Sequence, residues 1–593
     1  MATKPTPSKT VKKTAVTKKA SAKPAAKKAK PKTSAKSPYD AKPWLASYPK
    51  GVPTDIGPLK YNSVAALLED SCKRFGSKPA FTCMGKTISF SELHDQSSIV
   101  GAWLTAHGLS KGDRVAIMMP NILQYPAVMM GILRAGCTVV NVNPLYTPRE
   151  LEHQLKDSGA KAIFILENFA NTLQQVIAKT DVKHVVVTAM GDQMGGLKGA
   201  IVNLVVRKVK KMVPAWSLPG HTAYKAVING NGGSFSTVET GHDDPAFLQY
   251  TGGTTGVSKG AALSNSNVLS NAEQNTHWVE VAYRESGRPD NLTYICALPL
   301  YHIFALTVNA IMGMEQGAHN ILIPNPRDIP GFVKELGKYE FHAFPGLNTL
   351  FNALLNNEEF RKLNFKPLTL TLGGGMAVQR PVAEKWQALT GCSISEGYGL
   401  SETSPVATSN PFDAKSFSGT IGVPIPGTSI AIRDDDGKDL PLGEVGEICI
   451  KGPQVMVGYW NRPDETAKVM AKDGFFKSGD MGFMDERGFT KIVDRKKDMI
   501  LVSGFNVYPN EIEEVAASHE GILEAAAVAA PDEHSGEVVK LFVVKTDQSL
   551  TEQDVKDWCA KGLTNYKRPK YVIFKDELPK TNVGKILRRE LRD

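Results

Sequence analysis

Apolar residues follow two alternating patterns along most of the chain. Short runs rich in valine and isoleucine predict buried strands, whereas longer segments with an apolar residue every three or four positions predict amphipathic helices. In the first third of the chain, the pattern predicts helices at 61–75 and 90–108 and strands at 113–119, 137–142, 161–166 and 184–189. Because strands and helices alternate, we expect a layered α/β fold.

A second, smaller α/β pattern occupies the C-terminal end of the chain. It predicts helices at 510–518 and 552–563 and strands at 537–545 and 571–574. The charged run Asp494-Arg-Lys-Lys-Asp498 separates this pattern from the longer one. We therefore expect a large N-terminal domain over residues 39–496 and a small C-terminal domain over residues 497–593.

Residues 1–38 differ in composition from the rest of the chain. They contain twelve lysines and no aspartate or glutamate, and without them the formal net charge of the chain falls from +10 to −2. A segment of lysine, alanine and proline cannot bury enough apolar surface to fold, so we predict a disordered basic tail. Its charge suits an anionic partner, either nucleic acid or anionic lipid, and the absence of aromatic residues argues against base stacking.

Composition narrows the class of protein further. Hydrophobic residues make up 42% of the chain, enough for a large core. The seven cysteines are scattered without a C-x-x-C pair, which predicts neither a disulfide framework nor a zinc site and favours a reducing compartment. No run of eighteen apolar residues is present and the N-terminus lacks an apolar signal segment, so we expect a cytoplasmic protein without a membrane span.

The stretch Tyr250-Thr-Gly-Gly-Thr-Thr-Gly-Val-Ser-Lys-Gly260 carries the strongest local signal. Glycines allow backbone N–H groups to approach an anion closely, and the threonine hydroxyls and a lysine add donors and positive charge. The stretch is not a Walker A loop, because Lys259 is neither preceded by glycine nor followed by serine or threonine. It nevertheless predicts a phosphate-binding loop made of Thr251, Gly252, Gly253, Thr254, Thr255, Gly256 and Lys259.

Five further segments carry glycine turns, a histidine, carboxylates and a C-terminal lysine. They are Leu298–Phe304, Thr371–Met376, Glu396–Pro405, Asp473–Lys497 and Pro579–Arg589. A single glycine-rich segment is commonly an ordinary turn. Six such segments in a fixed order, spread over some 340 residues, form a much more specific pattern.

In this order the segments resemble the AMP-forming adenylating superfamily, which includes acyl-CoA synthetases, luciferases and peptide-synthetase adenylation domains. The likeness extends from about Trp44 to Asp593 and is greatest with the bacterial long-chain fatty-acid–CoA ligases. It implies a large α/β body of several subdomains and a small mobile C-terminal α/β domain. It also implies ATP-dependent conversion of a long-chain fatty acid into acyl-AMP and then, with coenzyme A, into acyl-CoA.

The resemblance gives nucleotide-binding roles to residues in these segments. The loop from Thr251 to Lys259 would hold the β- and γ-phosphates of ATP. Glu402, assisted by Thr251, would bind Mg²⁺, which favours oxygen ligands. Asp480 would accept hydrogen bonds from the ribose hydroxyls, with Arg495 as a second ribose contact. The residues implied at the adenine and the α-phosphate are Gly373, Gly374, Gly375, Tyr398, Gly399 and Ser401.

Lys585 is the main catalytic residue that the resemblance implies. Its ammonium would stabilise the charge that develops when a carboxylate attacks the α-phosphate. His302 would line the pocket for the acyl carboxylate without acting as a general base, because a fatty carboxylate is already ionised at neutral pH. The small domain would then rotate about a hinge at Lys497 and bring Gly504 to the pantetheine channel of coenzyme A.

Residues 201–212 combine apolar side chains at helical spacing with four basic side chains. The apolar ones are Ile201, Leu204, Val205, Val209 and Met212, and the basic ones are Arg207, Lys208, Lys210 and Lys211. Such a helix predicts either peripheral contact with an anionic membrane, at the inner face of the cell membrane, or packing of its apolar side on the body with the basic side solvated.

Two other functions are compatible with the sequence. A ligase for medium-chain or aryl acids would carry the same segments, because they do not include the acyl pocket. Binding of nucleic acid or another anionic surface through the tail belongs to a different class of function. It would account for the tail and leave the six segments without a role.

Overall fold

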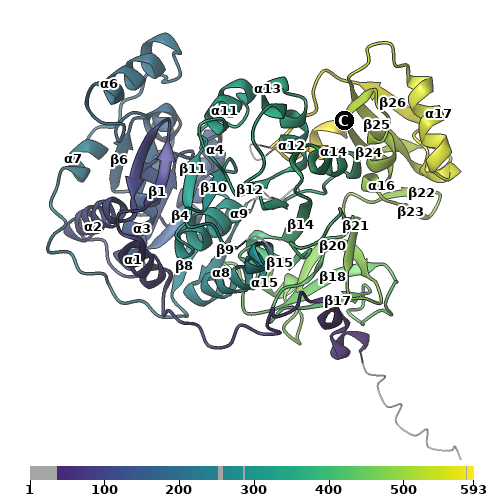
Figure 1. The fold of residues 1–593 in the computed structure, drawn as a ribbon, viewed down its shortest axis with the longest axis horizontal. Coiled ribbons are helices and arrows are strands. Elements are labelled where there is room, and N and C mark those ends of the chain that lie inside the picture. Colours follow the sequence, from purple (N-terminus) through teal and green to yellow (C-terminus); the bar gives the residue numbers. More distant parts are fainter. Residues whose placement is uncertain (1–36, 252–257, 285–286, 582–583, 593) are drawn as a thin grey trace, which may run out of the picture. The chain divides into compact units, whose positions relative to one another are not determined.

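The structure is a computed structural model that describes residues 37–251, 258–284, 287–581 and 584–592. Residues 38–593 form one compact unit. The strands of the described residues belong to four sheets, and the ribbon in Figure 1 is coloured along the sequence. The α/β fold class expected from the sequence is therefore confirmed, with a large N-terminal body and a small C-terminal domain.

The first sheet carries the predicted phosphate loop. Among the described residues it has eight strands in the order β19-β9-β8-β4-β3-β5-β6-β7, and the pairs from β8 to β7 are parallel. Only β8–β9 and β9–β19 are antiparallel in it. The strands are β3 (Arg114–Met118), β4 (Thr138–Asn141), β5 (Ala162–Leu166), β6 (His184–Thr188), β7 (Thr222–Ala223), β8 (Pro245–Thr251), β9 (Lys259–Ser264) and β19 (Gly458–Tyr459).

The second sheet carries the residues predicted to bind adenine, which lie in β13 and β14 and directly after β13. Its nine described strands run in the order β16-β15-β14-β13-β12-β10-β11-β1-β2, and the sheet changes from parallel to antiparallel pairing at β14–β15. They are β1 (Pro79–Cys83), β2 (Lys86–Ser89), β10 (Thr293–Cys296), β11 (His319–Leu322), β12 (Ala343–Gly346), β13 (Leu370–Gly373), β14 (Ile394–Gly399), β15 (Val406–Ser409) and β16 (Val423–Pro424).

Two smaller sheets follow along the chain. One is antiparallel and contains β17 (Ser429–Arg433), β18 (Gly446–Lys451), β20 (Phe476–Met484) and β21 (Thr490–Arg495). The other contains β22 (Ile500–Val502), β23 (Phe505–Val507), β24 (Ile522–Asp532), β25 (Gly536–Lys545) and β26 (Tyr571–Phe574). The chain passes between these sheets over residues 496–499, and the predicted hinge residue Lys497 lies in this connection.

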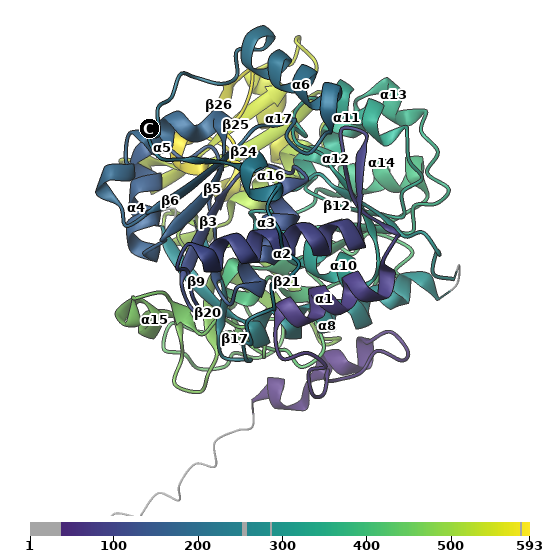
Figure 2. The same ribbon diagram turned by 90° about the vertical axis from the view of Figure 1, so that its left-hand side faces the viewer.

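Helices cover the two large sheets. Figure 2 shows α1 and α2 running across one face, with α3 close to α2. The longer helices of the body are α1 (Val64–Phe75), α2 (Phe90–Ala106), α3 (Gln124–Arg134), α4 (Pro148–Ser158), α6 (Gly196–Leu204), α8 (Asn265–Val279), α11 (Ile329–Leu336), α12 (Asn348–Leu355), α14 (Arg380–Thr390) and α15 (Pro463–Val469). Shorter ones are α5 (Ala170–Gln174), α7 (Tyr224–Ile228), α9 (Ile303–Ala305), α10 (Gly313–Glu315) and α13 (Glu358–Arg361). The small sheet packs against α16 (Pro509–Ala517) and α17 (Glu552–Gly562).

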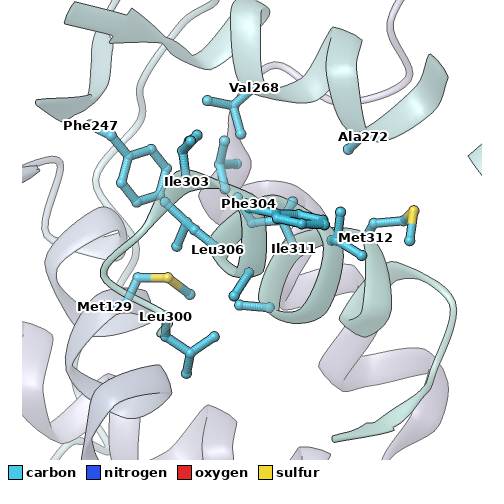
Figure 3. Packing of buried hydrophobic residues seen from close by; sticks show 14 of the residues in the cluster. Met129, Phe247, Val268, Ala272, Leu300, Ile303, Phe304, Leu306, Ile311 and Met312 are labelled. Carbon is cyan, nitrogen blue, oxygen red and sulfur yellow. The ribbon is translucent and has the colours of Figure 1, made fainter. Parts of the chain in front are cut away.

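The core is built from the apolar positions that the sequence pattern identified. One large cluster of buried side chains joins the first two sheets to the helices between them. Figure 3 shows part of it, where the segment from Ile303 to Met312 lies among Phe247, Val268 and Met129. The small C-terminal sheet has a separate core around Ile512, Leu541 and Val555 and can therefore hold its fold without the body's core.

Most predicted elements are confirmed to within one residue at each end. The clearest difference is the first helix, predicted from residue 61, which begins at Val64. The Ser63 side chain accepts a hydrogen bond from the backbone N–H of Ala66 and so caps the helix three residues later than the apolar spacing indicated. Within the part of the chain that the structure describes, no helix has the length and apolar character needed to cross a bilayer.

Candidate active site

The predicted phosphate loop lies in the sequence between β8 and β9, which pair with each other in antiparallel register. Gly252, Gly253, Thr254, Thr255 and Gly256 lie outside the described residues. Thr251 and Lys259 face each other at the two ends of the hairpin, and the Ser258 hydroxyl donates to the carbonyl oxygen of Thr251 at 2.7 Å. The ladder therefore fixes the two ends of the loop.

Lys259 is held by residues outside the loop. Its Nζ lies 2.6 Å from a carboxylate oxygen of Glu465, at the start of α15, and 4.8 Å from the centre of the Tyr459 ring. Hydrogen bonds from Lys259 and Lys468 lower the pKa of the Glu465 carboxyl to about 2. Lys259 is thus a charged donor whose present partner is a carboxylate.

Glu402 is the predicted magnesium ligand and lies in the short 3₁₀ helix Ser401–Thr403. Its side chain is buried, and the Tyr459 hydroxyl donates to its Oε1 at 2.7 Å. Burial raises the pKa of the Glu402 carboxyl, because the charged form loses hydration. Tyr459 therefore contacts both Lys259 and Glu402 and links the loop to the predicted metal ligand.

Asp480 and Arg495 pair across β20 and β21. Arg495 Nε lies 2.9 Å from Oδ1 of Asp480, and the Tyr398 hydroxyl donates to Oδ2 at 2.7 Å. The Asp480 side chain is almost fully buried. The predicted ribose residues thus lie together, and Tyr398 adjoins them through its hydroxyl.

The glycines after β13 allow close approach of other groups. A Cβ at Gly374 would lie 3.0 Å from the Phe304 ring and 3.1 Å from the carbonyl oxygen of Gly397. Gly375 has φ +76°, a conformation that glycine adopts without strain. Gly399 is constrained differently, because its Cβ would lie 1.8 Å from the Pro405 carbonyl oxygen, so its lack of a side chain is explained by the chain's own packing.

Lys585 reaches these glycines from the C-terminal end of the chain. Its Cε lies 3.4 Å and its Nζ 3.8 Å from the Cβ position of Gly375. The backbone beside it is held by the Thr349 hydroxyl of α12, which donates to the Gly584 carbonyl oxygen at 3.3 Å. Burial lowers the pKa of the Lys585 ammonium to about 8, with a further contribution from the charge of Arg495.

His302 lies close enough to Lys585 to feel its charge. Burial, with a smaller effect of Lys585, lowers the pKa of the His302 imidazole to about 3, so the ring is neutral at physiological pH. Its Nδ1 accepts a hydrogen bond from the backbone N–H of Phe304 at 3.3 Å, which assigns the proton to Nε2. His302 can therefore donate one hydrogen bond without bringing a charge.

Gly504, the predicted channel residue, lies at a different place. It follows Ser503 in the β22–β23 hairpin with φ +83°, and among the described residues no heavy atom lies within 4 Å of its Cβ position. The structure thus brings Lys585, and not Gly504, to the glycines after β13.

Comparisons with known proteins identify the family of the chain. A family model described as AMP-binding enzyme matches residues 68–460, and a model described as AMP-binding enzyme C-terminal domain matches residues 511–585. The chain belongs to the AMP-binding enzyme family.

Relatives in this family resemble the chain over almost its whole length. The long-chain-fatty-acid–CoA ligase of Yersinia pestis is 56% identical over 554 residues, which cover 93% of this chain and 98% of that protein. The enzyme of the same name from Bacillus subtilis strain 168 is 37% identical over 93% of this chain and 97% of its own length. The crystal structure of ATP-bound MatB from Rhodopseudomonas palustris has a TM-score of 0.76 and 29% identity, and covers 90% of this chain and 98% of its own.

Three residues of this AMP-binding enzyme were not identified from the sequence. Tyr459 and Glu465 hold Lys259, and Asp157 accepts hydrogen bonds from Tyr250 and Arg462, which flank the same region. Asp157 and Arg462 are separated by 305 positions, and Lys259 and Glu465 by 206. Neither local spacing nor composition links residues so far apart, so only the fold reveals these contacts.

Proposed function

We propose that this protein is a long-chain-fatty-acid–CoA ligase that forms AMP. It would convert a long-chain fatty acid and ATP into acyl-AMP and pyrophosphate, and then acyl-AMP and coenzyme A into acyl-CoA and AMP. The observation that carries the proposal is the placement of Lys585 against Gly375, beside the Asp480–Arg495 pair. Relatives that are named long-chain-fatty-acid–CoA ligases and are 37–56% identical support the substrate class.

ATP would lie among the glycines at the end of β13, the Asp480–Arg495 pair of β20 and β21, and the β8–β9 hairpin. We assign its adenine to the glycines 373–375, its ribose to Asp480 and Arg495, and its β- and γ-phosphates to the loop that ends at Lys259. Ser401 opens the 3₁₀ helix next to Glu402 and is assigned to the α-phosphate. Tyr398 would border the ribose site, because its hydroxyl donates a hydrogen bond to Asp480.

Magnesium would be held by Glu402 with the help of Thr251. The short helix of Glu402 contacts β8, which ends at Thr251. Burial raises the pKa of the Glu402 carboxyl although the nearby charge of Arg495 lowers it, and a bound cation would further offset the cost of burying this charge. Mg²⁺ binds through one or two carboxylates and phosphate oxygens, so Glu402 and the phosphates of ATP would supply its main ligands. When bound, the ion would neutralise phosphate charge.

In the first step, a carboxylate oxygen of the fatty acid attacks the α-phosphorus, and the bond from that phosphorus to the bridging oxygen breaks. Pyrophosphate leaves with the electron pair, and acyl-AMP remains. Negative charge increases on the phosphoryl oxygens during this step, and the Lys585 ammonium stabilises it. Neutral His302 would orient the substrate carboxylate through its Nε2–H and would take no proton.

In the second step, the thiol of coenzyme A loses its proton and attacks the acyl carbonyl carbon, and AMP leaves. We propose that Lys585 withdraws for this step as the small domain turns about Lys497. Gly504 would then reach the pantetheine channel, and its lack of a side chain would leave room for the thiol. The open surroundings of Gly504 and the position of Lys497 between two sheets support this assignment.

Separate measurement of the two half-reactions tests the proposal. Lys585→Ala should lower fatty-acid-dependent pyrophosphate exchange by about 10²–10³-fold, equal to about 3–4 kcal/mol, while conversion of supplied acyl-AMP and coenzyme A to thioester persists. Lys575→Ala, an exposed lysine of the same domain, is the matched control. Equal loss of both half-reactions in Lys585→Ala would refute the assigned role.

A panel of acids tests the substrate class. Thioester formation with acids of increasing chain length, and with benzoates, should favour the long-chain fatty acids. A preference for medium-chain or aryl acids would replace the proposed substrate and leave the adenylating chemistry in place.

We also propose that the protein makes peripheral contact with an anionic membrane from the cytoplasmic side, where its apolar substrate partitions. The basic tail, residues 1–38, lies almost entirely outside the described residues and is proposed as an accessory site for anionic lipid or nucleic acid. Salt-sensitive retention on DNA that disappears when residues 1–37 are deleted would identify the tail as a nucleic-acid contact. Retention that survives the deletion would exclude it.

A further inference from the structure

Exposed apolar side chains are concentrated in one segment of the molecule. Of the thirteen large apolar side chains that are exposed in the described residues, five lie between positions 197 and 212. They are Leu197, Ile201, Leu204, Val209 and Met212, with exposed fractions from 51% to 78%. Helix α6 and the π-helical turn that follows it (Val205–Val209) carry four of them (Figure 1). We refer to these five side chains as the α6 face.

The segment is attached to the body through its other side. Gly199 meets Gly191 so closely that a Cβ on either would lie 2.3 Å from the other's carbonyl oxygen. The buried Asn203 side chain accepts a hydrogen bond from the backbone N–H of Gly191 at 2.7 Å. Small and polar residues therefore form the attachment, whereas the apolar residues point away from it.

This orientation is the reverse of one sequence-based alternative, in which the apolar side packs on the body. Leu197, Ile201 and Leu204 are spaced i, i+4 and i+7 and so form one stripe of the helix. Gly199 and Asn203 lie on the opposite side of the same turns. The apolar stripe is therefore left without a partner in the described part of the chain.

Positive charge lies next to the apolar stripe. Lys208, Lys210 and Lys211 are exposed, and no ion pair of theirs occurs among the described residues. The other two cations are engaged: Arg207 pairs with Glu167 at 2.8 Å, and Lys198 donates to the Met84 carbonyl oxygen at 2.7 Å. No aspartate or glutamate occurs between positions 192 and 239, so the segment has no acidic residue of its own to offset the lysines.

We propose that the α6 face docks on the surface of an anionic lipid bilayer. Leu197, Ile201 and Leu204 would enter the boundary between headgroups and acyl chains, while the three lysines contact lipid phosphates. A bilayer fits this surface because it takes up an exposed apolar stripe and its anionic headgroups attract the adjacent positive charge. The inference locates the membrane contact proposed above, and it rests on the proposed ligase activity only for its purpose, since a fatty acid would be taken from the bilayer to which the enzyme binds.

Co-sedimentation with lipid vesicles tests the proposal. The probe is vesicles of phosphatidylcholine with about one-third phosphatidylglycerol. The protein is used with and without residues 1–37, so that binding through the α6 face is measured separately from binding through the basic tail. We expect the triple variant Leu197→Ser/Ile201→Ser/Leu204→Ser to reduce the bound fraction at least about tenfold in both forms. The variant Lys208→Gln/Lys210→Gln/Lys211→Gln should remove the dependence on phosphatidylglycerol and salt. Leu145→Ser/Val445→Ser, which changes two exposed apolar residues elsewhere, is the matched control.

A site-specific label gives a second readout if the triple variant folds poorly. Ile201→Cys carrying an environment-sensitive fluorophore should show a blue shift with the same vesicles, and a label at Val445→Cys should not. Six of the seven native cysteines are buried, so labelling can be directed to the new thiol.

Three outcomes would overturn the proposal. One is full vesicle binding by the apolar triple variant. Another is no binding by the wild-type chain. The third is a dimer of wild-type protein that the triple variant converts to a monomer, which would make the α6 face a protein interface. Thioester formation from a detergent-dispersed fatty acid should be equal in wild type and variants, so failure of docking is distinguished from failure of the proposed function.

Discussion

The charge of Lys585 is the property on which the proposed chemistry depends. Its pKa is lowered to about 8, and the ammonium is the acting form, so the active fraction falls as the pH rises through that value. We expect kcat/KM for ATP in pyrophosphate exchange to decline above about pH 8, because kcat/KM reports ionisation in the free enzyme. Lys585→Arg keeps the charge to far higher pH and should remove this decline, although its absolute rate is lower. If kcat/KM of Lys585→Arg declines at the same pH as that of the wild type, the decline is caused by the ionisation of another group.

If Lys259 binds the phosphates of ATP as proposed, Glu465 competes with ATP for Lys259. Because their ion pair must open before Lys259 can contact phosphate, Glu465→Gln should lower the KM for ATP by about two- to fivefold at low salt, with kcat unchanged. The measurement is steady-state kinetics at two salt concentrations, and the difference should shrink at high salt. Lys468→Gln removes the other partner of Glu465 and should leave the KM for ATP unchanged. A higher KM in Glu465→Gln would show that this carboxylate positions Lys259 for ATP.

The resemblance to the adenylating superfamily assigned roles to the charged residues of the proposed site but did not identify all of their partners. Lys259, Glu402, Asp480 and Lys585 occur in recognisable segments, and the structure places each where a nucleotide role is possible. Tyr459 was not identified, because a tyrosine in a short strand is usually an ordinary core residue. Its contacts with both Lys259 and Glu402 arise only when β19 pairs with β9.

Elements were predicted well where one apolar pattern determines them. The parallel strands β3 to β6 are buried on both faces and appear as continuous apolar runs, so their positions follow from the sequence. The pattern in α6 predicted a helix but not the side by which it is attached. That side is set by a contact between Gly199 and Gly191 and by one buried asparagine, and neither contributes to apolar periodicity.

The packing of α2 against α3 gives a test at the scale of elements. A Cβ at Gly131 of α3 would lie 2.6 Å from the Val100 side chain and 2.9 Å from the Ser97 carbonyl oxygen of α2. We expect Gly131→Ala to destabilise the body by about 1–3 kcal/mol, seen as a lower midpoint of thermal unfolding. Gly196→Ala is the matched control, because its Cβ would meet open space and alanine favours the helix. Adding Val100→Ala should recover little, since the Ser97 backbone still blocks the methyl group.

At the scale of the whole molecule, a few polar contacts hold the small domain where Lys585 meets Gly375. Thr349 of α12 donates to the Gly584 carbonyl oxygen at 3.3 Å, and Asn352 of the same helix donates to the Leu523 carbonyl oxygen at 3.2 Å. If the domain alternates as proposed, these bonds exist only in the orientation that forms acyl-AMP. They therefore favour one half-reaction at the expense of the other.

Thr349→Ala/Asn352→Ala should accordingly change the two half-reactions in opposite directions. Each hydrogen bond contributes about 0.5–1.5 kcal/mol, so the double variant should slow pyrophosphate exchange by roughly five- to a hundredfold. Thioester formation from supplied acyl-AMP should become faster, because the competing orientation has been weakened. Asn364→Ala removes an exposed side chain that accepts a hydrogen bond from the backbone N–H of Lys366 within the body, so it is the control and should change neither rate. General loss of structure would slow both half-reactions together, so a parallel decrease would argue against alternation, whereas opposite changes can arise only from a shift between two orientations.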